Sequence, residues 1–399
     1  MRIALFHNLP SGGAKRAVYE WTSRLAQKHS IDVFSLGSAD HAYGDIRSLV
    51  RSYKVYPFSP RKLFKSPFGR LNQMQRWLDL GTLAKINHRI AAEINRGGYD
   101  VVFANPCRYT FIPSLLPYLT IPSVYYLHEP FGRTFQRQIG RPYLRQNKLR
   151  QFLDRGDPLI WMYHHRLDSL QSRSLAKATL LLANSQFTRE QMRQGFGLEA
   201  AICHYGVDSD QFHPQPGLKK ENMLISVGEL SLRKGFDFVI ESVAQLPGEG
   251  RPRLLLACNR IDPQEQAYIQ NLANARGVEL QLKSNLNTQE LAMQYNLARL
   301  CIYAPYLEPF GLVPLEAMAC GTPVVGVREG GVSETILHER TGLLVERDTV
   351  KFGAAIRFLL ENPASCSEFG RQARVYVERE WSWSKSTADL ERNLAAAGS

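Results

Sequence analysis

Two glutamates in the second half of the chain are spaced so that both could hold one elongated ligand. Glu308 lies in a loop after an apolar run, Gly311 is placed to open a helix, and Glu316 follows about one turn deeper. The amides of Leu312 and Val313 would stand in the first turn, free to donate to a phosphate. Carboxylates accept paired hydrogen bonds from neighbouring hydroxyls, so a sugar and a ribose are natural targets. The alternative is that Glu308 caps the helix and Glu316 lies on the surface.

Two adjacent cations form a second candidate site. Arg233 and Lys234 follow the expected strand Met223–Gly228 and precede the expected helix Phe236–Leu246. Cations at the carboxyl edge of a sheet suit a diphosphate, and they would stabilise the charge that develops on a phosphate leaving group. The alternative is a basic turn that is simply solvated.

A pair of glycines, Gly12 and Gly13, follows the first apolar run and opens the first expected helix. Because glycine has no Cβ, the backbone can approach a ligand closely, and the free amides of a helix N-terminus favour an anion. The pair predicts a further ligand contact, with a simple turn as the alternative.

These residues stand within a regular alternation of apolar runs and helical stretches such as Ala14–Gln27 and Leu83–Ile94. Unbroken apolar runs between helices indicate parallel sheets covered on both faces. The predicted fold class is therefore α/β with two doubly wound domains, which bind ligands at the carboxyl ends of their strands. The runs that predict strands are Ile3–Phe6, Ile31–Leu36, Val101–Ala104, Ser123–Leu127, Leu180–Ala183, Met223–Val227, Leu254–Ala257, Val278–Leu282, Leu300–Tyr303 and Pro323–Val327.

The length of the chain predicts two domains, and a turn-rich segment and the charge distribution both place the boundary near residue 212. A chain of 399 residues is longer than one hydrophobic core usually serves, and the turn-rich segment 205–217 separates the two halves. We expect an N-terminal domain at 1–212 and a C-terminal domain at 213–380. Residues 1–212 hold 29 Lys and Arg against 15 Asp and Glu, whereas the remainder is nearly balanced. An anionic partner should therefore meet the first domain.

Two basic clusters carry much of this charge. The segment 61–70 mixes cations with Leu and Phe, and a second segment repeats arginine at intervals of four. Cations interleaved with bulky apolar residues suit an anionic membrane face or a phosphorylated lipid acceptor. Two solvated loops are the alternative, and nucleic-acid binding is disfavoured because no recognition motif accompanies the charge. The candidate surface residues are Arg61, Lys62, Lys65, Arg133, Arg137, Arg141 and Arg145.

The cysteines and the first residues of the chain indicate the cellular compartment. Six scattered cysteines without a close pair argue against a zinc site or a disulfide scaffold and indicate a reducing environment. No apolar run approaches the ~18 residues of a membrane span, and the first residues turn polar at His7, unlike a signal peptide. We expect a cytoplasmic protein that contacts the inner membrane face peripherally.

Taken together, these motifs resemble the retaining glycosyltransferases of family 4, which have the GT-B fold. Glu308 and Glu316 match the family's E-x7-E pair, supported by the segments 316–325, 330–334 and 341–345 and by the interdomain segment 205–214. The resemblance implies two Rossmann-like domains that face each other across a cleft. It also implies that the last helix, at 381–399, crosses back onto the first domain.

The resemblance assigns roles to the two glutamates and their neighbours. Glu316 would hold the ribose hydroxyls and Glu308 the transferred sugar, while the amides of Leu312 and Val313 would hold the distal phosphate. The residues expected to bind the nucleotide sugar are Gly12, Gly13, Arg233, Lys234, Glu308, Phe310, Gly311, Leu312, Val313 and Glu316.

His128, at the end of an expected strand, matches the place where family members put an active-site His or Asp. It joins Lys234 and Glu308 as a candidate catalytic residue, with a structural histidine as the alternative. The family usually has Gly-Arg where this chain has Gly228 and Glu229. Arg233 is therefore expected to replace the missing arginine beside the diphosphate.

The resemblance implies a metal-independent, retaining transfer of a hexose from a UDP- or GDP-sugar to a hydroxyl of a glycan, lipid-linked or small-molecule acceptor. No cofactor and no metal site are expected, because Asp208 and Asp210 belong to the interdomain segment rather than to a metal motif. The alternatives are a sugar-nucleotide epimerase of the same fold and a non-catalytic sugar- or lipid-binding module.

Overall fold

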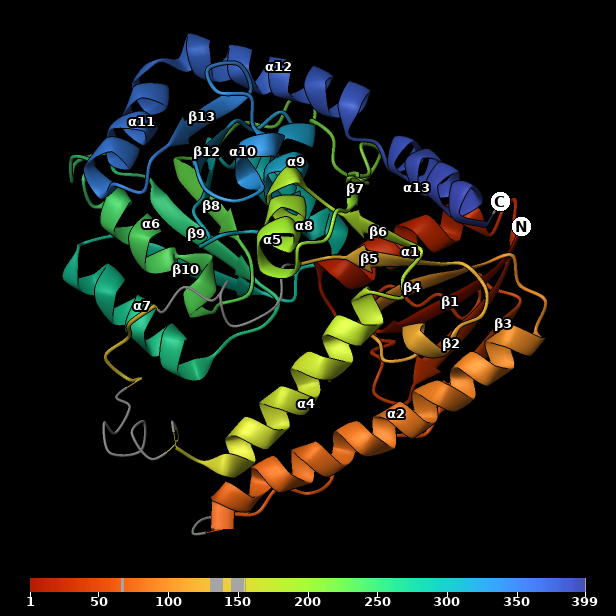
Figure 1. The fold of residues 1–399 in the computed structure, drawn as a ribbon. Helices are drawn as coiled ribbons and strands as arrows, with labels where there is room; N and C mark the ends of the chain where they lie inside the picture. Colours follow the sequence, from red (N-terminus) through yellow and green to blue (C-terminus); the bar gives the residue numbers. More distant parts are fainter. Residues whose placement is uncertain (66–67, 130–138, 145–153, 155, 399) are drawn as a thin grey trace.

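Two all-parallel β-sheets form the centres of two layered domains, which lie side by side in the computed structural model (Figure 1). The structure describes residues 1–65, 68–129, 139–144, 154 and 156–398. The first sheet has the strand order β3-β2-β1-β4-β5-β6-β7, and the second has the order β10-β9-β8-β11-β12-β13. In both sheets the order reverses beside the first strand of the domain. Ligands of open α/β sheets bind at such a reversal.

The first domain alternates strands with helices that cover both faces of its sheet. Its strands are β1 (Arg2–Asn8), β2 (Ser30–Leu36), β3 (Ser52–Tyr56), β4 (Val101–Cys107), β5 (Ser123–Leu127), β6 (Leu180–Ala183) and β7 (Ala201–Ile202). Its helices are α1 (Gly13–Leu25), α2 (Asn72–Arg96), α4 (Pro158–Leu175) and α5 (Gln186–Phe196).

The second domain repeats the plan and ends in three helices. Its strands are β8 (Met223–Val227), β9 (Arg253–Cys258), β10 (Leu280–Ser284), β11 (Leu300–Tyr303), β12 (Val324–Val327) and β13 (Gly342–Val345). Its helices are α6 (Phe236–Val243), α7 (Pro263–Ala275), α8 (Thr288–Leu297), α9 (Leu312–Ala319), α10 (Val332–Thr335), α11 (Thr349–Glu361) and α12 (Pro363–Glu380), followed by α13 (Trp383–Gly398).

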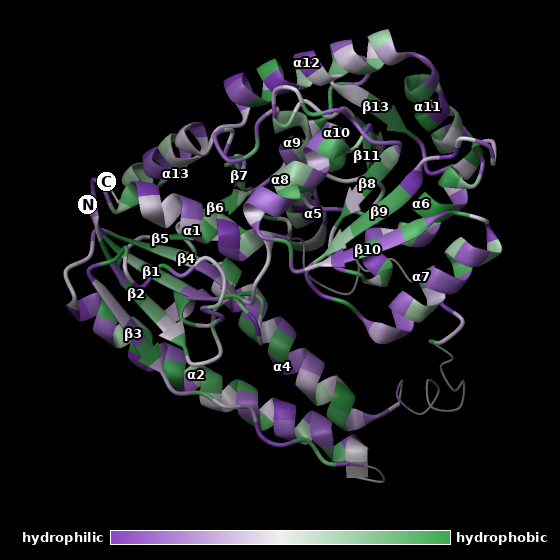
Figure 2. Ribbon diagram, turned by 180° about the vertical axis from the view of Figure 1, so that it is seen from behind, coloured by the Kyte–Doolittle hydropathy of each residue, from purple (hydrophilic) through white to green (hydrophobic). Residues whose placement is uncertain are grey.

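The apolar runs in the sequence correspond to the central strands, which are buried on both faces and appear mostly hydrophobic in Figure 2. The α/β class with two doubly wound domains is thus confirmed. The run Val278–Leu282 is displaced by two residues, because β10 covers Leu280–Ser284. The edge strand β3 was not predicted, since its residues are half-buried or exposed and lack an apolar run.

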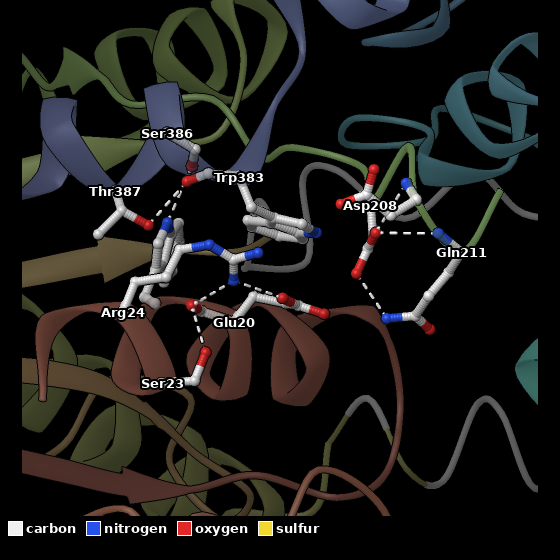
Figure 3. Close-up of polar contacts among 10 residues, drawn as sticks. Glu20, Ser23, Arg24, Asp208, Gln211, Trp383, Ser386 and Thr387 are labelled. Carbon is white, nitrogen blue, oxygen red and sulfur yellow. Dashed lines mark hydrogen bonds and ion pairs between the residues drawn. The ribbon is translucent and has the colours of Figure 1, made fainter. Parts of the chain in front are cut away.

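Two chain segments cross between the domains at one narrow joint. The amide of Val207 donates to the Trp381 carbonyl at 2.7 Å, and Val207 pairs with Ser382 in a parallel bridge. Beyond this point α13 packs on α1, where the Trp21 indole donates to the Ser386 hydroxyl at 2.8 Å. Figure 3 shows Ser386 and Thr387 of α13 on the side that faces Arg24 of α1. The last helix therefore returns to the first domain.

The joint leaves no room for a side chain at position 206. A Cβ added to Gly206 would overlap the Trp383 backbone nitrogen and lie 2.6 Å from the Ser382 carbonyl carbon. Both obstacles are backbone atoms, which cannot move aside without displacing the start of α13. Gly206 is thus required by close approach.

We predict that Gly206→Ala lowers the free energy of unfolding by ~1–3 kcal/mol, the usual cost of overpacking. Gly248→Ala is the matched control, because an added Cβ there meets nothing within 4 Å. Urea unfolding followed by tryptophan fluorescence measures both variants. Equal stability of Gly206→Ala and the wild type would show that the crossing can widen without cost.

Candidate active site

The loop that carries Glu308 is held in a strained shape between β11 and α9. Leu307 has a φ of 49°, which a non-glycine residue rarely adopts, and Gly311 has a φ of 105°. The Glu308 carbonyl accepts a hydrogen bond from the Gly331 amide at 2.8 Å. α9 begins at Leu312, so the amides of Leu312 and Val313 lie in the first turn as the spacing predicted.

Lys234 and Glu308 meet at this loop. The Lys234 ammonium donates to Glu308 Oε2 at 2.8 Å, and both side chains are largely buried. Gly228 permits this placement, because a Cβ there would lie 3.2 Å from Lys234 Cδ. Gly235 adopts a left-handed φ of 65° directly after Lys234, against the Ala304 carbonyl. The two candidate catalytic residues of the second domain thus form one ion pair.

Glu316 is buried and both of its oxygens are engaged. Oε1 accepts from the Arg16 guanidinium of α1, and Oε2 accepts from the Tyr295 hydroxyl at 2.9 Å. The pKa of Arg16 is raised: burial opposes its charge, but the Glu316 carboxylate outweighs that cost. Arg16 comes from the first domain, so this ion pair also joins the domains. Neither Arg16 nor Tyr295 was singled out from the sequence.

The glycine pair lies directly across from the start of α9. A Cβ added to Gly13 would lie 3.4 Å from Leu312 Cδ1, and Gly12 precedes α1 with a φ of 149°. The N-termini of α1 and α9 therefore approach each other from opposite domains. Both ends carry free amides and the positive pole of a helix dipole, which favours an anion between them.

Arg233 faces the first domain. Its guanidinium lies 3.7 Å from the Glu129 carboxylate, directly after β5, and both side chains are substantially exposed. Glu229, which stands where the family has arginine, lies 3.5 Å from Arg260. The carboxylate at position 229 therefore has a cation of its own nearby, and Arg233 lies beside Glu129 of the first domain.

Arg347 was missed by the sequence reading although it supports this region. Its guanidinium donates to the carbonyls of Ala304 and Pro305 at 3.0 and 2.6 Å, pairs with Glu329, and lies 4.0 Å from the centre of the Tyr306 ring. It therefore fixes the start of the Glu308 loop from behind. No signal near Arg347 in the sequence could have linked it to a loop some forty residues away.

His128 is buried, and both ring nitrogens have protein partners. Nδ1 lies 2.6 Å from the Tyr205 hydroxyl and Nε2 lies 2.9 Å from Asn105 Oδ1. Burial lowers the pKa of His128 to about 3, so the ring is neutral near pH 7. The Trp21 and Tyr126 rings pack beside it. The geometry thus indicates that His128 holds Tyr205 and Asn105 in place rather than transfers protons.

The Phe310 side chain is also buried. Its ring is 2% exposed and packs against Tyr205 and Trp381 at centroid distances of 5.0 and 5.5 Å. Its side chain belongs to the aromatic joint between the domains. Any contact of Phe310 with a nucleotide sugar would therefore run through the backbone.

The expectation that Arg141 forms part of a surface cluster is wrong. Its side chain is 2% exposed and pairs with Glu265 at 3.0 Å and with Asp237 at 2.9 Å, both in the second domain. A buried guanidinium must be neutralised where it lies, so Arg141 cannot also face an anionic surface. Arg61, Lys62 and Lys65 are exposed as predicted. Arg133, Arg137 and Arg145 lie outside the described residues.

Among the residues that the structure describes, no group of three or more His, Cys, Asp or Glu side chains is placed to hold a metal ion. In the same part of the chain, no helix combines the length and the apolar character needed to cross a membrane.

The low pKa of His128 predicts how stability depends on pH. An unfolded histidine has a pKa of ~6.5, so between that value and about 3 the unfolded chain binds a proton that the folded protein excludes. Stability therefore falls as the pH falls through this window, by up to ~1.4 kcal/mol per pH unit. His128→Gln should reduce this slope, whereas His88→Gln, at an exposed position, should not. Unfolding free energies at about pH 4 and about pH 6 test this, and unchanged slopes would contradict the burial of a neutral ring.

Comparison with known proteins identifies the family and the fold to which this site belongs. The family model described as Glycosyltransferase Family 4 matches residues 11–211, and the one described as Glycosyl transferases group 1 matches residues 208–376. The Anabaena protein Alr3699/HepE, solved in complex with UDP and glucose, superposes with a TM-score of 0.74 over 99% of both chains at 17% identity. This likeness supports the GT-B fold.

Curated relatives match a part of their length. The chain is 28% identical over 233 residues to D-inositol 3-phosphate glycosyltransferase 2 of Catenulispora acidiphila, covering 53% of this chain and 54% of that protein. It is 29% identical to the GDP-mannose-dependent alpha-(1-6)-phosphatidylinositol monomannoside mannosyltransferase of Mycolicibacterium smegmatis, covering 53% and 60%. The chain thus spans little more than half the length of these two relatives. Because one family model covers half of the chain, and the two-domain fold agrees with it, the chain belongs to glycosyltransferase family 4.

Proposed function

We propose that the protein transfers a hexose from a nucleotide-diphosphate sugar to a hydroxyl acceptor, with retention of configuration and without a metal ion. The observation that carries this proposal is the convergence of Lys234, Glu308 and Glu316 around the N-terminus of α9. The UDP and UDP-glucose bound to the Anabaena protein, and the GDP-mannose dependence of the mycobacterial relative, support a UDP- or GDP-sugar donor.

The cations and helix N-termini around the site support a diphosphate ligand. Lys234 and Arg233 each lie near a carboxylate. The helix N-termini at Gly13 and Leu312 add free amides, which carry partial positive charge. An incoming diphosphate would bind the free amides and would replace Glu308 as the partner of Lys234. Glu308 could then bind the sugar. Glu316 would exchange Arg16 for the ribose hydroxyls, while Tyr295 holds its second oxygen.

In the transfer, the bond between the anomeric carbon and the leaving phosphate oxygen breaks as the acceptor oxygen bonds to that carbon on the same face. The acceptor proton passes to the departing diphosphate. Lys234 and the amides of Leu312 and Val313 stabilise the negative charge that develops on the leaving group. No protein nucleophile is required, so Glu308 serves to orient the sugar.

His128 is proposed to support the wall of the sugar site through Tyr205 and Asn105 rather than to exchange protons. A ring whose pKa is about 3 stays neutral near pH 7 and is a poor general base. It holds the Tyr205 hydroxyl and Asn105, at the ends of the interdomain segment and of β4. A displaced ring would shift the wall of the cleft beside Glu129.

The acceptor is proposed to be a glycan, a lipid-linked sugar or a small molecule that binds the first domain. The protein would act in the cytoplasm, with Arg61, Lys62 and Lys65 toward an anionic membrane face. Their exposure and the charge excess of residues 1–212 support this location.

Turnover should depend strongly on Lys234. We predict that Lys234→Ala lowers kcat by ~10²–10³ at saturating donor, as expected when a group aimed at transition-state charge is removed. Lys219→Ala, an exposed lysine of the same domain, is the control and should keep wild-type turnover. Donor hydrolysis measured with UDP- and GDP-sugars would reveal both rates. A near wild-type kcat for Lys234→Ala would refute the leaving-group role.

Nucleotide affinity should depend on the charge of Glu316. Glu316→Gln keeps an acceptor for Tyr295 but weakens the bonds to ribose, at a cost of ~1.5–3 kcal/mol in donor binding. Glu249→Gln, an exposed glutamate of the same domain, should bind donor normally. Calorimetric titration with UDP and GDP measures the difference, and equal affinities would remove the ribose role from Glu316.

A further inference from the structure

The N-terminal parts of α2 and α4 extend beyond the core of the first domain. The buried residues of α2 begin only at Asp79, and α4 buries only Gln171, Ser174 and Leu175 near its end. At 1.5 Å per residue, the 25 residues of α2 span ~37 Å, whereas a seven-residue strand of the sheet spans ~23 Å. The two helix starts therefore project from the molecule, as both ribbon views show (Figures 1 and 2).

The two projecting parts are held side by side. Arg70 lies 3.7 Å from Asp157, and the Arg166 guanidinium donates to the Trp77 carbonyl at 3.1 Å while lying 4.2 Å from the centre of its ring. Because residue 70 faces residue 157 and residue 77 faces residue 166, the helices run in the same direction. Their N-termini thus form one surface, here called the α2/α4 end, which comprises residues 61–65, 69–78 and 157–166.

This end gathers exposed apolar side chains. Trp161 is 65% exposed, more than any other large hydrophobic residue in the described part of the chain. Leu71, Met74 and Leu78 recur at helical spacing and so form one stripe along α2. Seven of the seventeen exposed large hydrophobic residues among those described lie here, namely Leu63, Phe64, Leu71, Met74, Leu78, Trp161 and Met162.

The α2/α4 end carries an excess of positive charge, with Asp157 as its one acidic residue. Residues 61–78 contain five basic residues and no acidic one. Two of the cations have carboxylate partners: Arg61 pairs with Asp79, and Arg70 lies near Asp157. Among the described residues, Lys62, Lys65 and Arg76 have no acidic partner, which leaves positive charge beside the apolar side chains.

This combination identifies the partner by its chemistry. A second copy of the chain would bring the same cations face to face across a two-fold interface, which repels. An anionic bilayer accepts the cations at its headgroups and the apolar side chains just below them, and tryptophan is enriched at that depth. The charge pattern therefore favours a lipid surface over a protein.

We propose that the α2/α4 end docks on an anionic lipid bilayer, with Trp161, Met162 and the α2 stripe inserted at the interface and Lys62, Lys65 and Arg76 at the headgroups. The inference rests on the membrane contact in the proposed function and extends it by naming the surface that inserts. It does not depend on sugar transfer, since vesicle binding needs no donor.

Co-sedimentation of the full chain with vesicles tests the docking. We expect binding to vesicles that contain phosphatidylglycerol, little binding to pure phosphatidylcholine, and weakening at high salt, because exposed charges are screened. Trp161→Ser with Met162→Ser should reduce binding at least tenfold. Lys62→Gln with Lys65→Gln and Arg76→Gln should do the same, by a separate route.

The control variants change the same kinds of residue elsewhere. Val350→Ser with Phe358→Ser alters two exposed apolar residues of α11, and Arg189→Gln with Lys219→Gln alters two exposed cations. These variants should bind vesicles as the wild type does. Equal losses in the test and control variants would overturn the proposal, because binding would then follow total charge or hydrophobicity.

Fluorescence reports the insertion itself. The difference between wild-type and Trp161→Phe spectra isolates one of five tryptophans and should shift to the blue on adding anionic vesicles. No shift, or a lipid-free dimer that dissociates in Trp161→Ser, would overturn the proposal in favour of a protein interface. Donor hydrolysis measured without vesicles stands apart, so loss of either property alone is attributed to its own site.

Discussion

The arrangement of the cleft depends on the narrow crossing between Gly206 and the start of α13. Two segments pass between the domains there, joined by the bond from the Val207 amide to the Trp381 carbonyl. Around the crossing, Trp21 packs against Tyr126, Tyr205 and Trp383 within 6.1 Å between ring centroids. This packed aromatic joint fixes the two domains to each other at the crossing. It therefore sets how closely the N-termini of α1 and α9 can approach.

The contacts across the cleft are polar, unlike the joint. Arg16 pairs with Glu316, Arg141 with Glu265, and the Glu334 carboxylate accepts from the first amides of α5 at 2.8 and 2.9 Å. Each exchanges solvation for a partner, so its net contribution is smaller than its Coulomb energy. Such contacts can be replaced by a ligand that offers equivalent charge. The domains are thus joined by apolar packing at the aromatic joint and by polar contacts at the cleft.

The sequence was sufficient for the central strands and for the Glu308 loop, because both depend on local patterns. Buried parallel strands are apolar throughout, and the step from loop to helix at Gly311 can be read within ten residues. It was insufficient for Arg16, Tyr295 and Arg347, whose roles arise from partners distant in the chain. An isolated arginine has no periodicity that reveals its partner. Arg141 shows the converse error, since regular spacing of arginines indicated a surface while the fold buries this member.

The excess positive charge of the first domain therefore divides into two uses. Arg16 and Arg141 cross to the second domain and are neutralised by its carboxylates Glu316, Asp237 and Glu265. Lys62, Lys65 and Arg76 lie instead where α2 and α4 extend beyond the sheet that they cover. A helix gains nothing for the core by extending past it with apolar residues exposed. Cations placed beside those residues match the proposed contact with a surface that is both apolar and anionic.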